Sequence, residues 1–205
     1  PKPSSAASDV YKRQIPRTTI GAQELILDLL KERAETGRIY IMNIDHCNEH
    51  SSFKDKVNMS NLCQEITLPT MPINHIDDPN GEIALCILSA INVGKLRDLS
   101  ELEELCDLSV RGLEELIDYQ HYPVDAAKRS TLARRSLGIG FIGLAHYLAK
   151  AGVKYDDKEA WKLVHDLTEA FQYNLLKASN QLAKERGPCD YYKRTKSVSY
   201  THLTL

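Results

Sequence analysis

The near-continuous apolar run IALCILSAINV at residues 83–93 most limits what this chain can fold into. A strand without polar alternation is typical of a sheet that is covered on both faces, as in parallel sheets flanked by helices. Gly94 closes the run. An amphipathic pattern follows over residues 99–119, with Ser100 as the expected N-cap and Glu103 three residues later. Helices between apolar strands predict an α/β architecture.

Further elements are read from periodicity and from glycine and proline positions. We predict helices over residues 19–36, 141–151 and 157–186, a strand over residues 38–44 and a polar loop over residues 45–60. Gly37 and Gly187 end the first and last of these helices. About three to five strands result, whereas a closed α/β barrel needs eight or more. The positions expected to face inward are Leu25, Ile26, Leu29 and Leu30 in the first helix, and Leu99, Leu102, Cys106, Leu113, Leu116 and Ile117 in the helix over residues 99–119.

Composition excludes several classes of protein. A net charge of −2 gives no basic excess for nucleic acid, and no apolar stretch approaches the length of a membrane span. The five cysteines are odd in number and form no CxxC pair, which favours reduced thiols over a disulfide framework. No secretory signal is visible, so we expect a cytoplasmic protein.

The two ends differ in character from the middle. Residues 1–14 are small, polar and aperiodic, and residues 197–205 are rich in serine and threonine without helical period. Segments of this kind are excluded from fold reasoning as non-native tails. The expected folded part is therefore residues 15–196.

The segment SNLCQEI at residues 60–66 carries the strongest chemical pattern. In an extended conformation Asn61, Cys63 and Glu65 project to one side, because side chains alternate along a strand. A carboxylate can accept a proton from a substrate hydroxyl, and an amide can hold that hydroxyl in place. The nearby carboxylate disfavours the thiolate of Cys63, which makes one-electron chemistry more attractive than ordinary nucleophilic attack. The spacing alone also fits a polar loop with a buried cysteine.

Other motifs have ordinary explanations. Cys86, inside the apolar run, fits a small buried hydrophobe, as does Cys106 in its helix. A metal site at His46, Cys47 and His50 lacks a second ligand cluster, and we expect no metal. The glycines at 138, 140 and 143 match G-x-G-x-x-G by letter, but a charged, helix-like segment precedes them where the dinucleotide fingerprint needs a buried strand. We assign no function to Cys189 or to Tyr191-Tyr192.

Four stretches together resemble one family. They are RIYIMNIDH (38–46), SNLCQEI (60–66), GEIALCILSAINVG (81–94) and RRSLGIGFIGLAHYLAK (134–150). This combination is similar to the large (alpha) subunit of class I ribonucleoside-diphosphate reductases, closest to the bacterial class Ia form. The resemblance runs from about residue 15 to residue 196. It implies a ten-stranded α/β barrel with a central finger loop, incomplete in this chain, over residues 15–196.

The resemblance also implies roles for individual residues. Cys63 would lie at the tip of the finger loop, become a thiyl radical and abstract the 3′ hydrogen of a ribonucleoside diphosphate. Glu65 would take the 3′-hydroxyl proton, and Asn61 would hydrogen-bond the substrate hydroxyls. Cys86 would belong to a redox pair that reduces the 2′ position and becomes a disulfide, with its partner cysteine outside this sequence. Substrate binding would involve the run Asn61, Leu62, Cys63, Gln64 and Glu65.

Cofactors and partners follow from the same resemblance. The full enzyme would depend on a small (beta) subunit with a di-iron centre and a tyrosyl radical, on nucleotide effectors and on a thioredoxin- or glutaredoxin-type reductant. The full-length subunit would be a homodimer. We expect neither a nucleic acid nor a membrane partner, no cofactor bound to this segment, and no reductase activity from this segment alone.

Two alternatives remain. An adenosylcobalamin-dependent relative would share the barrel and the radical cysteine but would need no partner subunit. A non-enzymatic helical interaction module would explain the amphipathic helices over residues 99–119 and 157–186. It would not explain a buried strand together with the Asn61, Cys63 and Glu65 pattern. A cavity beside the cysteines would favour the enzyme.

Overall fold

The structure is a computed structural model that describes residues 18–196. The chain divides into two compact units, residues 1–42 and 43–205, and each is described by itself. The proposed non-native tails, residues 1–14 and 197–205, lie outside the described residues. No helix in the described part of the chain has the length and apolar character needed to cross a membrane.

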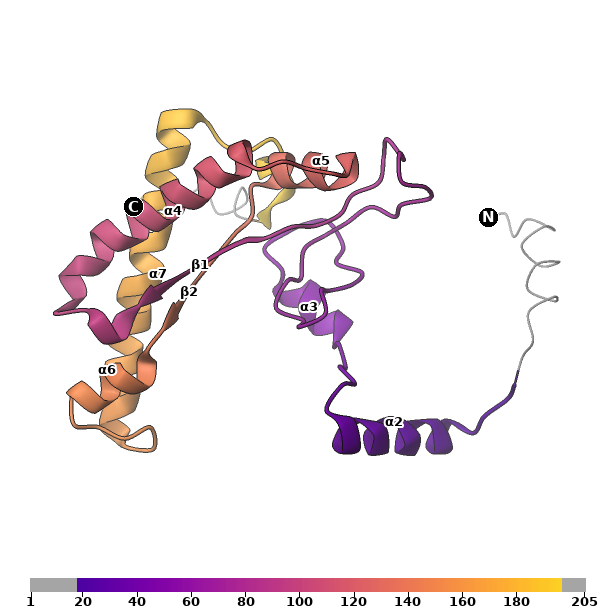
Figure 1. Ribbon diagram of the computed structural model, residues 1–205, viewed down its shortest axis with the longest axis horizontal. Helices are drawn as coiled ribbons and strands as arrows, with labels where there is room; N and C mark the ends of the chain where they lie inside the picture. Colours follow the sequence, from indigo (N-terminus) through magenta and orange to yellow (C-terminus); the bar gives the residue numbers. More distant parts are fainter. Residues whose placement is uncertain (1–17, 197–205) are drawn as a thin grey trace. The chain divides into compact units, whose positions relative to one another are not determined.

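The first unit contains the predicted helix, α2, which spans Ala22–Thr36 (Figure 1). Gly37 ends it in a left-handed conformation with a φ of 66°, and its N–H donates to the carbonyl of Arg33. Glycine adopts this conformation without a steric penalty. The stripe expected to face inward is wrong, because α2 has no buried residue. No other helix or strand is described in this unit, so none of its described elements covers the stripe.

The predicted strand over residues 38–44 is also wrong. Residues 38–43 have no regular structure, and the helix α3 spans Ile44–His50, within the segment predicted as a loop. A side chain explains this outcome: Asn48 donates to the carbonyls of Ile44 and Val57, and its Oδ1 accepts from the N–H of Val57. Val57 is fully buried, so Asn48 fastens α3 to the segment that follows it.

One parallel pair of strands forms the sheet of the second unit in the described residues. β1, Ile87–Asn92, pairs with β2, Leu137–Ile142, in the register Ile87↔Leu137 to Asn92↔Ile142. Parallel strands need a crossover, and the helices α4, Leu102–Tyr119, and α5, Asp125–Arg134, lie in that connection. The α/β prediction is therefore confirmed, although the described sheet has fewer strands than the three to five expected.

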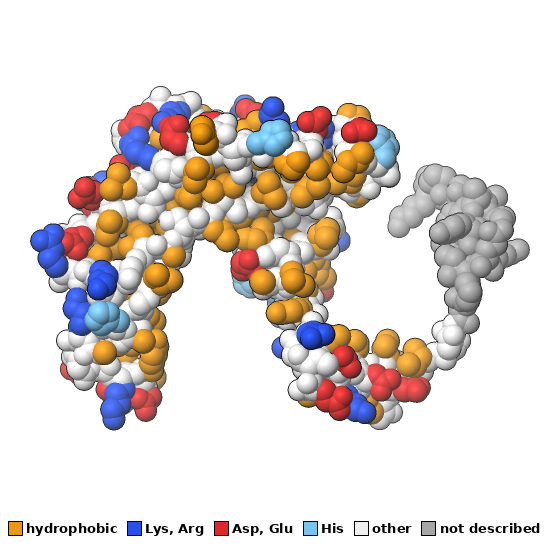
Figure 2. Space-filling model, viewed as in Figure 1, with side chains coloured by type: hydrophobic (Ala, Val, Ile, Leu, Met, Phe, Trp, Pro, Cys, Tyr) orange, Lys and Arg blue, Asp and Glu red, His pale blue; other side chains and the backbone are white. Residues whose placement is uncertain are grey.

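The strand expected over residues 83–93 is shorter and is not buried on both faces. Ile91 is buried in the core, whereas Leu88 is 60% exposed. Among the described residues, α4 and α7 pack against one face of this sheet. The apolar run therefore contributes to a core on that face and lines an open surface on the other. Figure 2 shows hydrophobic side chains beside the two strands and charged side chains over α4.

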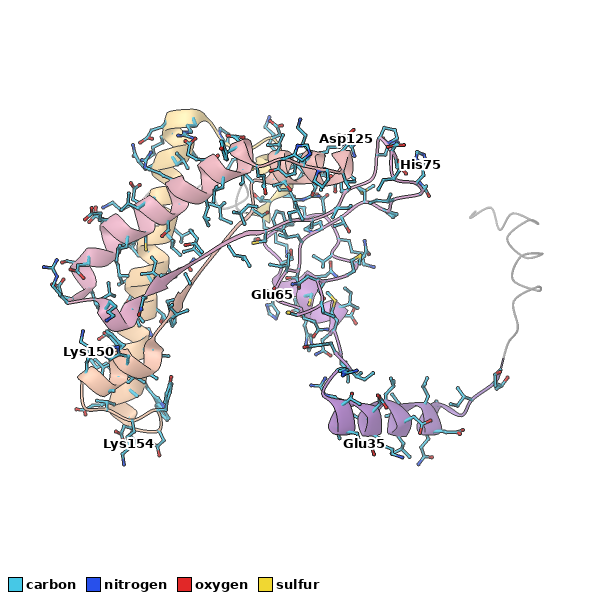
Figure 3. The ribbon with its side chains drawn as sticks, in the orientation of Figure 1. Glu35, Glu65, His75, Asp125, Lys150 and Lys154 are labelled. Atoms are coloured by element: carbon cyan, nitrogen blue, oxygen red, sulfur yellow. The ribbon has the colours of Figure 1, made fainter. Side chains whose placement is uncertain are left out.

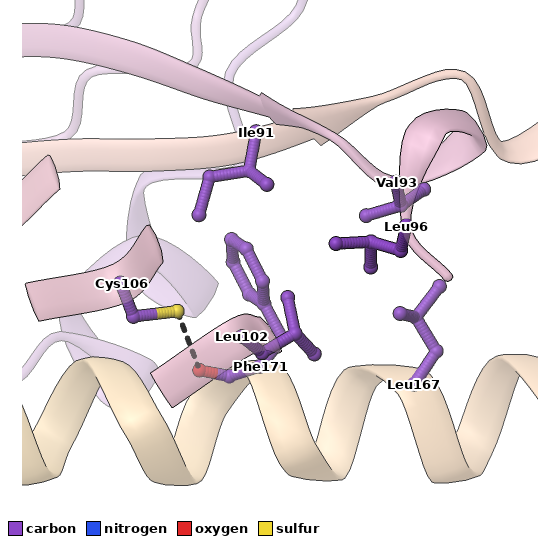
Figure 4. Close-up of a cluster of buried hydrophobic side chains, with 7 residues drawn as sticks. All are labelled: Ile91, Val93, Leu96, Leu102, Cys106, Leu167 and Phe171. Atoms are coloured by element: carbon purple, nitrogen blue, oxygen red, sulfur yellow. Dashed lines mark hydrogen bonds between the residues drawn. The ribbon is translucent and has the colours of Figure 1, made fainter. Parts of the chain in front are cut away.

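The core lies between the sheet, α4 and the long helix α7, Lys158–Arg186 (Figure 4). Phe141 of β2 and Phe171 of α7 pack edge to face, with ring centroids 5.5 Å apart. On α4 the predicted stripe is largely confirmed, except that Leu116 is exposed and Val110 is buried in addition. The buried residues of the main cluster are Ile91, Val93, Leu96, Leu102, Cys106, Leu167 and Phe171.

The predicted capping box at the start of α4 is wrong. A short 3-10 turn, Leu99–Glu101, precedes the helix, and Asp98 caps it by accepting from the N–H of Ser100 at 2.8 Å. Aspartate is as good an N-cap as serine, and Asp98, two residues before Ser100, begins a 3-10 turn that leads into the helix.

A helix follows β2 directly. Gly143 has a φ of 82° and leads into α6, Leu144–Lys150, which is shorter than the predicted helix over residues 141–151. A Cβ at Gly143 would lie 2.5 Å from Oδ1 of Asn92 and 3.1 Å from the N atom of Gly94. The absent side chain therefore allows α6 to approach the turn that ends β1.

Candidate active site

A cavity of about 900 Å³ opens on the uncovered face of the sheet. Its wall is built from the end of α3, the segment Glu65–Leu68, β1 and β2. The groups that bear chemistry on this wall include the Glu65 carboxylate, the Cys86 thiol, the His50 imidazole and several hydroxyls, among them those of Ser89 and Ser136. Figure 3 shows Glu65 on the loop beside α3. The cavity thus joins a carboxylate and a thiol that are distant in sequence.

Cys86 and Glu65 interact electrostatically across this wall. Partial burial raises the pKa of the Cys86 thiol, and the negative charge of Glu65 raises this pKa further. Both effects disfavour the thiolate. At neutral pH Cys86 is therefore a protonated thiol, which suits a donor of hydrogen and electrons better than a nucleophile.

The SNLCQEI segment is not extended, so the predicted alternation of its side chains is wrong. Residues 61–64 form a tight turn in which the N–H of Gln64 donates to the carbonyl of Asn61 at 3.1 Å. Gln64 has a φ of 63°, and Oδ1 of Asn61 accepts from the N–H of Ile66 at 2.9 Å. Asn61 therefore uses its side chain to close the turn, a common role of asparagine in loops.

The predicted site residues divide into two groups. Glu65 and Cys86 line the cavity, whereas Asn61, Leu62, Cys63 and Gln64 form the turn just before it and are not part of its lining. Cys63 is exposed on that turn, and Leu62 is 81% exposed. Since Cys63 precedes Glu65 by two residues, their Cα atoms are at most about 7 Å apart. Cys63 is thus tethered at the edge of the cavity.

The remaining motifs form neither a metal site nor a dinucleotide site in the described residues. His46 and His50 lie four residues apart on α3, but no group of three or more metal-ligating side chains occurs among residues 18–196. Gly138 and Gly140 lie inside β2, not in the turn after it, which rules out the dinucleotide fingerprint. Cys106 is buried with its thiol 3.9 Å from the Phe171 carbonyl, and burial raises its pKa to about 11.

Sequence reasoning missed a buried ion pair near the site. Nη2 of Arg134 donates to Glu82 at 2.9 Å, and each side chain is only 2% exposed. The guanidinium of Arg134 also lies 5.0 Å from the ring centroid of Tyr191, whose other neighbour is Arg194 at 4.2 Å. No periodic signal connects these residues, because Glu82 and Arg134 are 52 positions apart.

Comparison with known proteins gives consistent matches. Residues 6–204 match the family described as "Ribonucleotide reductase, barrel domain". The chain is 60% identical over 184 residues to the ribonucleoside-diphosphate reductase subunit alpha of Haemophilus influenzae, covering 88% of this chain and 24% of that protein. It is 55% identical over 184 residues, with the same coverages, to the Escherichia coli ribonucleoside-diphosphate reductase 1 subunit alpha. The chain spans about a quarter of the length of these relatives.

A solved structure is also similar. It is the class Id ribonucleotide reductase alpha subunit of Actinobacillus ureae, with a TM-score of 0.66 and 29% sequence identity. The match covers 91% of this chain and 34% of that one. The similarity in fold therefore extends over most of the described residues.

Proposed function

Because this chain belongs to the ribonucleotide reductase barrel-domain family, we propose that it supplies the radical site of an alpha subunit that reduces ribonucleoside diphosphates to 2′-deoxyribonucleoside diphosphates. The expected fold, part of an α/β barrel, agrees with the family match and with the parallel strands. The observation that carries the proposal is the cavity, which has Glu65 and Cys86 on its wall, together with Cys63, which precedes Glu65 by two residues in the sequence.

We assign the steps of the reaction to individual residues. Cys63, as a thiyl radical, takes the 3′ hydrogen of the ribose while Glu65 accepts the 3′-hydroxyl proton. The 2′ hydroxyl then leaves as water. Cys86 and a partner thiol outside this sequence supply two electrons and two protons and become a disulfide, and Cys63 returns the hydrogen to C3′. The sum is ribonucleotide plus two thiols giving deoxyribonucleotide, water and a disulfide.

The environment of Cys86 supports its role as a reductant. A thiol that must deliver a proton along with its electron has to be protonated before the reaction, and the raised pKa of Cys86 favours this form. Asn61 is placed in the same reaction by the resemblance alone. In the turn its amide oxygen accepts from the N–H of Ile66. The second lone pair of that oxygen and the amide NH2 group remain for the substrate hydroxyls.

The radical source and the reductant lie outside this chain. We propose a class I small subunit with a di-iron centre as the source of the radical, a thioredoxin- or glutaredoxin-type protein as the reductant, nucleotide effectors, a homodimeric alpha subunit and a cytoplasmic location, where thiols stay reduced. The alternative of a helical interaction module gains nothing from the structure, because Cys86 lines a cavity.

Reconstitution tests the proposal and its closest rival. A full-length alpha subunit that carries this sequence is mixed with a class I small subunit, a dithiol reductant and a ribonucleoside diphosphate, and deoxynucleotide is measured. We expect product with the small subunit and none when adenosylcobalamin replaces it. Product with adenosylcobalamin alone would reassign the chain to the cobalamin-dependent class, and no product in either mixture would contradict a reductase.

The pH dependence of Cys86 alkylation tests its pairing with Glu65. In the full-length alpha subunit we expect the alkylation rate of Cys86 to reach half its maximum at a higher pH than that of an ordinary thiol, because burial and the Glu65 charge both raise the pKa of Cys86. Glu65→Gln removes the charge, so the pKa should fall while the contribution of burial remains. Mass spectrometry of the Cys86 peptide after timed iodoacetamide treatment measures the rate at each pH. Glu49→Gln, an exposed carboxylate on α3, is the matched control. An unchanged profile in Glu65→Gln would show that the two groups do not interact.

A further inference from the structure

Gly138 lies directly beside the Cys86 thiol. It occupies β2 opposite Leu88 of β1 in the parallel register. A Cβ built at Gly138 would lie 2.8 Å from Sγ of Cys86 and 2.5 Å from Cδ2 of Leu88. Real Cβ atoms do not approach other heavy atoms this closely. The space that any other residue would fill is therefore taken by the two neighbouring side chains.

The backbone does not account for a glycine at this position. Gly138 does not have a positive φ, so residues other than glycine can adopt its backbone conformation. Glycine inside a strand costs stability, because it has no side chain to pack and more backbone freedom to lose. The close approach of neighbouring side chains is the remaining physical reason for it.

The two neighbours differ in how easily they could give way. Leu88 is 60% exposed, and Cδ2 is the far end of a flexible side chain that can swing into the cavity. The position of Cys86 Sγ depends on a single side-chain torsion, χ1, and the residue is partly buried. The sulfur can therefore move away only if χ1 rotates to another rotamer. A side chain at position 138 would therefore be tolerated by Leu88 and would redirect Cys86.

We propose that Gly138 is a positioning residue for Cys86: the missing side chain is the slot that holds the sulfur against β2 at the cavity wall. This inference deepens the proposed function, since it rests on Cys86 as the thiol that reduces the substrate. Gly138 itself contacts no reacting atom. Its effect is to fix the direction from which the thiol reaches the 2′ carbon.

The experiment compares Gly138→Ala with Gly140→Ala in the full-length alpha subunit that carries this sequence. Gly140 lies two residues further along the same strand, and a Cβ there meets nothing within 4 Å. The primary measurement is the rate of Cys86 alkylation by iodoacetamide in the reduced protein, read by mass spectrometry. The buried Cys106 is read in the same sample as a check that the core remains folded.

We expect Gly138→Ala to speed Cys86 alkylation by about fivefold or more, because the thiol is pushed off β2 into the open cavity. Gly140→Ala should stay within about twofold of the parent. Turnover of Gly138→Ala should fall at least about tenfold below that of the parent while substrate binding is retained. In the double variant Leu88→Ala/Gly138→Ala, the new Cβ at position 138 no longer overlaps the Leu88 side chain. The ratio of its Cys86 alkylation rate to that of Leu88→Ala therefore reports the contact with Cys86 alone.

The outcomes separate this inference from the function on which it rests. Faster Cys86 alkylation in both Gly138→Ala and Leu88→Ala/Gly138→Ala, each against its own parent, supports the positioning role. If turnover is then unchanged, the positioning role stands but Cys86 is not the reductant, and the proposed function fails. Alkylation rates that stay within about twofold of their parents, or that fall, overturn the inference whatever the turnover. If Cys106 becomes reactive in Gly138→Ala, the double variant alone decides.

Discussion

Replacing Cys63 by serine should abolish deoxynucleotide formation in the full-length alpha subunit while ribonucleoside diphosphates still bind. A serine hydroxyl has nearly the size of the thiol but cannot form a comparably accessible radical, so the first step loses its hydrogen acceptor. We expect turnover to fall at least about a hundredfold, which corresponds to about 3 kcal/mol of transition-state stabilisation. Cys63 is exposed on its turn and packs against no core, so the substitution should leave the fold intact.

The control for this result is Cys47→Ser. Cys47 is a partly buried cysteine on α3 and is not part of the cavity lining, so its replacement should leave turnover close to that of the parent. Nucleotide binding to each variant is measured separately by equilibrium methods. Residual activity of Cys63→Ser above a few per cent of the parent's would remove Cys63 from the radical step.

The second large effect is expected at the buried ion pair. Arg134→Met leaves the Glu82 carboxylate buried without its cation, and it also removes the hydrogen bond that Arg134 donates to Oγ of Ser130. Removing one partner of such a pair typically costs about 3–5 kcal/mol. Amide hydrogen exchange measures this locally at Tyr191, whose N–H donates to the Ala133 carbonyl, and at Ile83, whose N–H donates to Ala126. Exchange there should accelerate about a hundredfold or more.

Two further variants identify the cause of that effect. Replacing both partners, in Glu82→Met/Arg134→Met, removes the stranded charge and should recover most of the lost protection. Lys162→Met breaks an exposed pair with Asp166, in which the lysine side chain is 80% exposed, and should change exchange by less than about twofold. Equal exchange rates in Arg134→Met and in the parent would mean that the pair does not hold α5 to the segment around Glu82.

The two longest helices were predictable from the sequence, whereas the strands were predictable only in part, since β1 lies within the run over residues 83–93. α4 and α7 carry long apolar stripes with clear ends, so their positions follow from local pattern. The segment over residues 38–44 has strand composition but no strand beside it, and Asn48 instead stabilises a helix just after it. The run over residues 83–93 looked buried on both faces because the sequence cannot tell which neighbours this chain contains.

The candidate site was predictable in part. Glu65 and Cys86 were identified by resemblance, and the structure brings both to one cavity. The geometry derived from spacing failed because Asn61 closes a turn with its own side chain. Gly138 looked like part of a misleading glycine motif, and its contact with Cys86 depends on the register between β1 and β2. The ion pair of Glu82 and Arg134 likewise arises from packing between distant segments.

The most direct test of the central claim is a crystal structure of the full-length alpha subunit, carrying this sequence, with a ribonucleoside diphosphate bound. We expect the ribose in the cavity, its C3′ about 3.5 Å from Sγ of Cys63 and its 3′ hydroxyl about 3 Å from the Glu65 carboxylate. The Cys86 thiol should face the 2′ carbon. A ribose bound away from Glu65 and Cys86, or a Cys63 that stays outside the cavity when substrate is present, would contradict the assignment.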